Sequence, residues 1–162
     1  MIRPDGILEV RCPLRLKQSR VDDFIREKDA WIGQKLKAQQ NQVSIFLPLP
    51  SEYKQLAKET TMLTELLMPR FASLRPTRIT IGRQRKRWGS CNSKGYIRIN
   101  ACLSLLPEPL AEYIIAHELC HLVHLNHSAD FHNLLQQLLP DARVRQRALS
   151  RYHLVDQTPS DR

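Results

Sequence analysis

Apolar and polar residues follow a helical period over the first part of the chain. In residues 19–40 the apolar side chains recur close to every 3.6 positions, which predicts an amphipathic helix with Ser19 as its N-cap. A second helical pattern begins at Ser51, after a loop that holds two prolines, and Pro69 is expected to kink or end this helix. These patterns predict two helices before residue 77.

Three more helices are predicted in the second half of the chain. Residues 110–125 form an apolar-periodic segment after two prolines, with acidic residues near its positive N-terminal end. Another helix is expected to start near Ser128. The last is expected to start near Asp141, whose side chain could cap it, and to run on to Leu154.

Two short segments alternate apolar and polar residues, which predicts strands that each bury one face. They span residues 77–82 and 95–100, where isoleucines occupy every second position. Near the N-terminus, a Pro-Asp-Gly turn signal at residues 4–6 precedes a partly alternating run over residues 8–12. We interpret this run as a turn that enters a strand.

Length and composition predict one domain. A chain of 162 residues with 42% hydrophobic content can bury one sizeable core, so we expect a single domain over residues 1–162, with a frayed tail at residues 156–162. No apolar segment approaches the roughly eighteen residues that a membrane span needs, and the first residues lack the apolar core of a signal peptide. The four cysteines form no CxxC pair and are expected to be reduced, which predicts a cytoplasmic location.

Positive charge dominates the chain, because 25 lysines and arginines oppose 16 acidic residues and give a net charge of +9. The strongest cluster is the basic loop, residues 83–94, which contains Arg83, Arg85, Lys86, Arg87 and Lys94. Trp88 in this loop could stack on a base. The basic loop therefore predicts contact with nucleic acid or another polyanion, and the alternative is a solvated basic surface without a partner.

The segment HELCHLVHLNH, residues 117–127, holds four of the six histidines. His117 and His121 are four positions apart, so a helix places both imidazoles on one face, within reach of one metal ion, with Glu118 beside them. This is the HExxH arrangement of zinc hydrolases. The alternative is a pair of ordinary histidines on a helix, which explains neither the spacing nor the glutamate.

A catalytic zinc needs three protein ligands and an open position for water, and His127 is the favoured third ligand. On an unbroken helix His127 would lie about 15 Å from His117 along the axis, so the chain must turn first. Asn126 tolerates the left-handed conformation that ends helices, which predicts a break near residues 124–126. Two residues on the next predicted helix compete for the role: Asp130 and His132.

Three neutral histidines would leave the ion most of its charge and bring the pKa of a bound water towards about 7. Glu118 would take the proton from that water and later deliver it to the leaving group. The sequence therefore predicts a zinc-dependent hydrolase with His117, His121 and His127 as metal ligands and Glu118 as the catalytic residue.

Several separated motifs occur in an order that is similar to one protein family. They are VRCP at 10–13, REKDAW at 26–31, RWGSC at 87–91, Asn100, HELCH at 117–121 and NHSADF at 126–131. Together they resemble the YgjP-like metallopeptidase domain family, zincins related to SprT-like proteases, over about residues 4–135. The chain departs from the family pattern at His132, where a tryptophan is common, and the first strand of the family's opening hairpin is expected to be missing.

The resemblance implies a small α+β zincin domain with a mixed β-sheet packed on helices and an active-site helix that carries HExxH. It also implies that His117, His121 and His127 bind zinc, that Glu118 is the catalytic acid and base, and that the substrate is a polypeptide.

Two other functions fit the same residues. One is the zinc-dependent hydrolysis of nucleotide phosphoanhydrides, with the basic loop holding the phosphates, although no Walker-type glycine loop or carboxylate cluster for Mg²⁺ is visible. The other is a nucleic-acid-binding module with a structural zinc. Such a zinc would need a fourth protein ligand, for which the candidates are Cys91, Asp130 and His132.

Overall fold

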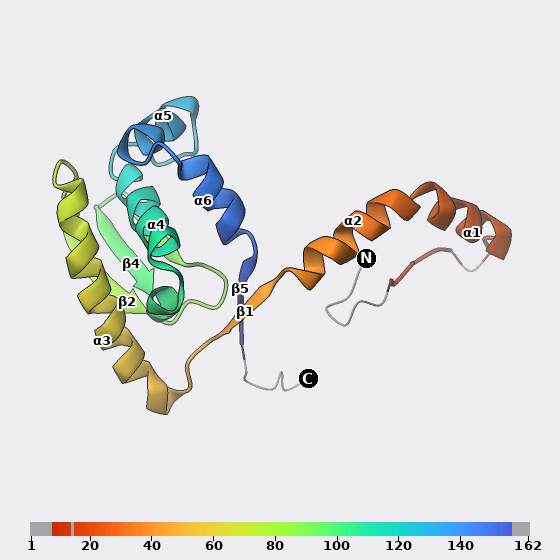
Figure 1. Ribbon diagram of the computed structural model, residues 1–162, viewed down its shortest axis with the longest axis horizontal. Coiled ribbons are helices and arrows are strands. Elements are labelled where there is room, and N and C mark those ends of the chain that lie inside the picture. Colours follow the sequence, from red (N-terminus) through yellow and green to blue (C-terminus); the bar gives the residue numbers. More distant parts are fainter. Residues whose placement is uncertain (1–7, 14, 157–162) are drawn as a thin grey trace. The chain divides into compact units, whose positions relative to one another are not determined.

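The computed structural model describes residues 8–13 and 15–156, and Figure 1 shows the course of the chain. The chain divides into two compact units, residues 1–43 and residues 44–162. The single domain predicted over the whole chain stays a prediction. The predicted frayed tail lies outside the described residues, apart from its first position, Asp156.

The first unit contains two helices, α1 (Gln18–Glu27) and α2 (Asp29–Gln40). The prediction of one helix over residues 19–40 is therefore wrong at Lys28, where the backbone has φ −97° and ψ 6°. The N–H of Lys28 bonds to the carbonyls three and four positions earlier. Such a shared bond tightens the last turn of a helix, and here it interrupts the helical run.

The N-terminal strand predicted over residues 8–12 does not form among the described residues, where Leu8 makes only an isolated bridge. The alternation there covers three apolar positions, and so short a pattern does not determine a strand by itself. The turn signal at residues 4–6 lies outside the described residues.

The second unit is built on a three-stranded sheet with strand order β2-β4-β3. The strands β2 (Arg78–Gly82) and β4 (Tyr96–Asn100) confirm the two segments predicted from alternation, and they run parallel. β3 (Gly89–Cys91) lies inside the basic loop and pairs antiparallel with β4, so the sheet is mixed. The isoleucines of β2 and β4 stand opposite each other, which makes one face of the sheet apolar.

Two helices cover this apolar face (Figure 1). The first is α3 (Pro50–Leu67), which ends, as predicted, where Pro69 enters a 3-10 turn, η1 (Met68–Phe71). The second is α4 (Glu108–Cys120), which follows a 3-10 turn, η2 (Ala101–Leu105), and is buried along most of its length. The predicted α+β class is confirmed. No helix among the described residues has the length and apolar character needed to cross a bilayer.

Two further helices, α5 (Ala129–Leu138) and α6 (Ala142–Leu149), precede the strand β5 (Tyr152–Val155). β5 pairs with β1 (Val43–Phe46) in a two-stranded sheet. The prediction that the last helix continues to Leu154 is therefore wrong. The aromatic and β-branched residues of this segment favour extended backbone, and the pairing with β1 satisfies its backbone groups.

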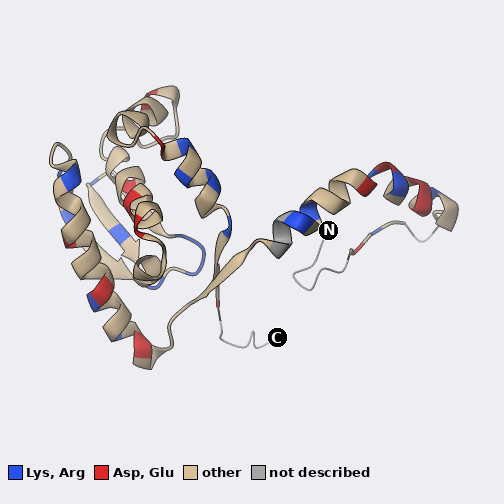
Figure 2. Ribbon diagram, in the orientation of Figure 1, with Lys and Arg blue, Asp and Glu red and all other residues tan. Residues whose placement is uncertain are grey.

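A cluster of ion pairs fixes the N-terminal half of α4. Glu112 is 8% exposed, and its carboxylate binds Arg70 of η1 at 2.8 Å as well as Arg145 of α6. Arg70 also pairs with Glu108, at 2.8 Å, and Arg145 pairs with Asp141, at 2.9 Å. Asp141 therefore binds Arg145 and makes no capping bond, contrary to the prediction from the sequence. Figure 2 shows the acidic residues of α4 and the basic residues of α6.

Replacing Glu112 with glutamine is expected to lower the free energy of unfolding by about 2 kcal/mol, because two arginines lose a charged partner. Chemical denaturation measures this change. Glu108→Gln is the matched control on the same helix. It is expected to cost less than about 1 kcal/mol, because Glu108 is half exposed. If both variants lost the same free energy of unfolding, the buried ion pairs of Glu112 would contribute no more to stability than the exposed pair of Glu108.

The same ion pairs make stability depend on pH. Burial pushes the pKa of Glu112 upwards, but hydrogen bonds from Arg145 and Arg70 outweigh it and hold the pKa below its usual value. The stability that Glu112 contributes is therefore present above the usual pKa of a glutamate and is lost as the pH falls through the lowered value. Denaturation at a series of acidic pH values should show the wild type and Glu112→Gln converging.

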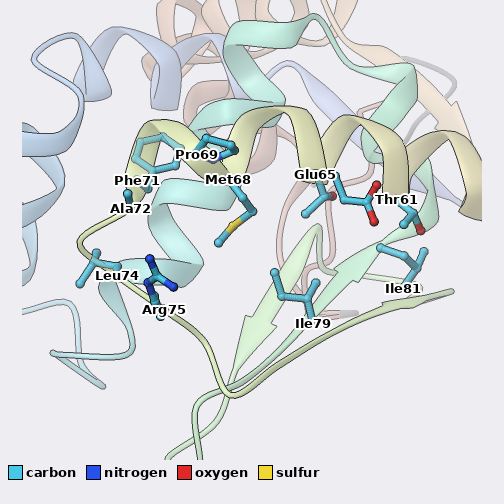
Figure 3. A pocket seen from close by; sticks show the side chains of 11 residues that line it. Thr61, Glu65, Met68, Pro69, Phe71, Ala72, Leu74, Arg75, Ile79 and Ile81 are labelled. Carbon is cyan, nitrogen blue, oxygen red and sulfur yellow. The ribbon is translucent and has the colours of Figure 1, made fainter.

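An apolar cavity of about 680 Å³ lies between the α3–η1 segment and the edge strand β2. Figure 3 shows the side chains of Met68, Ile79 and Ile81 among those that line it. The two isoleucines continue the apolar face of the sheet to its edge.

Candidate metal centre

The helix that carries the HExxH motif ends earlier than predicted. α4 stops at Cys120, and His121 is its C-cap. The N–H groups of Val123 and His124 both bond to the carbonyl of Cys120, at 3.1 and 2.9 Å. The predicted break near residues 124–126 is therefore displaced by about one turn towards the N-terminus.

The chain turns without the left-handed residue that the sequence predicted. Among the described residues only Gly95 has a positive φ, so Asn126 does not take that conformation. Ser128 does cap α5 as predicted, because its hydroxyl accepts a hydrogen bond from the N–H of Phe131 at 3.4 Å. Because α4 ends early and α5 begins at Ser128, the chain turns back and His127 lies next to His117 and His121.

Three histidine rings meet at this turn. One ring nitrogen from each of His117, His121 and His127 lies within 4.8 Å of the other two. Nε2 of His117 and Nε2 of His127 are 3.1 Å apart, so they either share a proton or leave their lone pairs for a cation. The competing candidates Asp130 and His132 do not join this group, and the ring centroid of His132 lies 6.4 Å from that of His127.

The backbone of the turn orients the ring of His121. Its Nδ1 lies 2.9 Å from the carbonyl oxygen of His124. Because a carbonyl only accepts, Nδ1 carries the proton and Nε2 keeps the lone pair that can bind a metal. Contacts of this kind set the tautomer and direction of metal-binding histidines.

Phe131 is fully buried and packs against all three rings. Its ring centroid lies 4.9, 4.7 and 4.8 Å from those of His117, His121 and His127. Burial, together with the charges of the neighbouring histidines, lowers the pKa of His117 to about 4, so this imidazole is neutral near pH 7. Phe131 belongs to a motif of the predicted family, but the sequence did not predict its contact with the three histidines. The signal for this contact was its position three residues after Ser128, which caps the helix next to His127.

The donor set fits a zinc ion. In a tetrahedral site the ligand nitrogens lie about 3.3 Å apart, which is comparable with the spacing of this cluster. All three donors are imidazole nitrogens, and no fourth cysteine, histidine or carboxylate joins them within the described part of the chain. Three protein ligands leave one coordination position open, which is the arrangement of catalytic zinc sites.

Glu118 is held between α4 and β3. It is 6% exposed, and burial raises its pKa to about 7 against the opposing charge of Arg87. A Cβ at Gly89 would lie 2.6 Å from both Cγ and Oε1 of Glu118, so the carboxylate occupies space that any side chain at position 89 would fill. The glycine of the RWGSC motif therefore permits the close approach of β3 to the glutamate.

A cavity of about 300 Å³ opens beside His117 and Glu118. Arg87, Trp88 and Tyr113 also line it, and Trp88 packs against the hydrophobic core of the unit. The carboxylate and one of the clustered histidines therefore face a space in which a substrate can bind.

A comparison with protein families classifies the chain. The model of the YgjP-like metallopeptidase domain matches residues 49–152, more than half of the chain. The chain belongs to this family. The family predicted from separated motifs is therefore confirmed, and YgjP-like membership implies a peptidase that acts on polypeptide and requires a metal ion.

The matched residues of this YgjP-like protein begin well after residue 4 and extend past residue 135, the limits predicted for the resemblance. No curated protein matches the chain. A solved structure that does match is the metallopeptidase zymogen of Pyrococcus abyssi abylysin, with 23% sequence identity and a TM-score of 0.47, over 59% of this chain and 99% of that chain.

Proposed function

We propose that the chain is a zinc peptidase in which His117, His121 and His127 bind the ion and Glu118 is the catalytic acid and base. The observation that supports this proposal is the convergence of three imidazoles, with no fourth protein ligand among the described residues, next to a buried glutamate. When bound, zinc supplies Lewis-acid chemistry: it polarises the scissile carbonyl and lowers the pKa of a water molecule.

Glu118 performs the proton transfers. The attacking water must lose a proton and the leaving amine must gain one, and a single carboxylate can hold the proton between these two steps. Burial disfavours the charged form of a carboxyl group, so Glu118 accepts a proton more readily than an exposed glutamate does. Its place on α4 next to His117, lining the same cavity, supports this role.

The remaining residues of the centre orient and enclose it. The carbonyl of His124 holds the ring of His121, and the buried ring of Phe131 excludes water from the side of the cluster that it covers. Trp88 and Tyr113 give the cavity an aromatic wall against which a polypeptide can lie.

The alternative functions have less support. A structural zinc would need a fourth protein ligand, which the described residues do not provide. Phosphoanhydride hydrolysis and nucleic-acid contact through residues 83–94 gain no support from the structure, and both stay predictions, as does the cytoplasmic location.

Elemental analysis of purified variants tests the ligands. The wild type is expected to hold about one zinc per chain, and His127→Ala is expected to bind zinc at least about tenfold more weakly, because it loses one of three donors. His132→Ala is the matched control, since its ring lies near His127 but outside the cluster, and it should keep its zinc.

Loss of zinc from His132→Ala but not from His127→Ala would overturn this ligand assignment. Peptidase activity is measured in parallel on a denatured protein, with and without a chelator. A fully zinc-loaded wild type that cuts no polypeptide would contradict the proposed function itself.

A further inference from the structure

Two cavities adjoin at the metal centre. The cavity of about 300 Å³ beside Glu118 shares Trp88, Gln146 and Leu149 with a second cavity of about 470 Å³. The second cavity is lined by the basic loop, α6 and β5. We call the two cavities together the extended cleft. A cleft that continues beyond the reacting group can bind substrate residues on one side of the scissile bond and use that binding for catalysis.

The extended cleft is positively charged apart from Glu118. Arg85, Lys86 and Arg87 line it, whereas Glu118 is the single carboxylate among its described lining residues. Arg85 is engaged with Asp156 at 2.7 Å. Lys86 and Arg87 are exposed, and neither forms an ion pair with a carboxylate among the described residues, although the charge of Arg87 acts on Glu118. Figure 2 shows these residues as the blue segment of the loop beside α6.

Lys86 and Arg87 line different parts of the extended cleft. Arg87 lines the cavity at the metal centre, and Lys86 lines the adjoining one. Between them, Trp88 and Leu149 belong to both cavities and pack against the hydrophobic core, which gives the cleft a fixed apolar wall. A polypeptide lying along this wall passes both cations.

We propose that this enzyme prefers polypeptides that carry an acidic side chain close to the scissile bond, recognised by Arg87 and, further along the extended cleft, by Lys86. This inference rests on the proposed peptidase function. Unpaired guanidinium and ammonium groups form charge-assisted hydrogen bonds with carboxylates. A positive cleft also raises the local concentration of an acidic substrate.

A peptide carboxylate suits these groups better than a nucleic acid does. Nucleic-acid binding would use the whole basic loop, but Arg83 and Arg85 already lie 3.8 and 2.7 Å from carboxylate oxygens of Asp156. Trp88 is partly buried against the core, so less of its ring is available for stacking on a base than in an exposed tryptophan. Of the cations in the loop that remain available, Lys86 and Arg87 line the same cleft as the catalytic glutamate.

Matched peptides test the proposal on the zinc-loaded full chain. A cleaved peptide is remade with one glutamate or one glutamine at each of the four positions on either side of the scissile bond. At one or more positions on one side, kcat/KM is expected to be about three- to fivefold higher for glutamate than for glutamine. The preference should shrink as salt is added.

Charge-reversed variants identify the recognising residues. Arg87→Glu and Lys86→Glu are each expected to reduce the preference, and the double variant should favour glutamine. Arg143→Glu is the control. It changes an exposed arginine of α6 that lines neither cavity, and it should keep the wild-type preference.

The possible failures can be told apart. If the wild type cuts glutamate and glutamine peptides equally well at every position, this inference is wrong while the peptidase function stands. If single-stranded DNA inhibits the wild type but not the double variant, and no peptide preference is found, the cations serve nucleic acid and the inference is also wrong. If no peptide is cut by zinc-loaded protein, the proposed function and the inference both fail.

Discussion

Glu118→Gln is expected to lower kcat/KM on polypeptide by about 10³-fold while leaving the zinc content unchanged. The amide has nearly the same size as the carboxylate, so it fits the same space between α4 and β3. It cannot accept and return the proton that peptide hydrolysis moves from water to the leaving amine. Steady-state kinetics and elemental analysis on the same preparation measure the two quantities.

Glu108→Gln is the control for the loss of a glutamate from the same helix. Glu108 is half exposed and pairs with Arg70, away from the cavity at the metal centre, so this variant should keep its activity. If Glu118→Gln retained more than about a tenth of wild-type activity, Glu118 would not be the acid and base, since proton transfer by a positioned side chain is worth at least about 10²-fold.

Gly89→Ala is expected to reduce kcat by about 10²-fold, with zinc content again unchanged. The added Cβ would lie 2.6 Å from Cγ and Oε1 of Glu118, closer than such atoms can approach. The carboxylate must therefore move away from the position from which it transfers a proton. KM should change little, because the peptide-binding walls of the cavity are formed by other side chains.

Two comparisons separate this positioning role from a merely structural one. Gly33→Ala adds a methyl group where no atom lies within 4 Å, and it should leave activity unchanged. In a Glu118→Ala background, which removes Cγ and the carboxylate, Gly89→Ala should change the residual activity little, because no atom is left to clash with the added methyl group. An equal loss in both backgrounds, accompanied by a matching fall in Tm, would show that Gly89 acts through the fold alone.

The parts of the centre that could be predicted are those set by short-range geometry. His117 and His121 share a face because a helix repeats every 3.6 residues, and Glu118 adjoins them in the sequence. The need for a turn before His127 also follows from helix dimensions. The way in which the chain turns could not be predicted. Asn126 does not take the expected left-handed conformation, and α4 already ends at Cys120.

The contacts that the sequence did not reveal are long-range. Gly89 meets Glu118 because β3 pairs with β4 and lies against α4, and a local pattern of residues does not encode that packing. The same reason explains the errors in the fold. Tyr152–Val155 becomes a strand through pairing with β1, which lies about a hundred positions earlier and overrides the helical pattern before it.

The orientation of His121 by the carbonyl of His124 has a consequence for protein engineering. A backbone oxygen is the same whichever amino acid carries it, so the identity of residue 124 can be varied while the tautomer of the neighbouring imidazole is retained. What must be kept is the number of residues between the end of α4 and that oxygen. Insertions and deletions in this turn, rather than substitutions, are therefore the changes expected to alter the direction of the His121 ring.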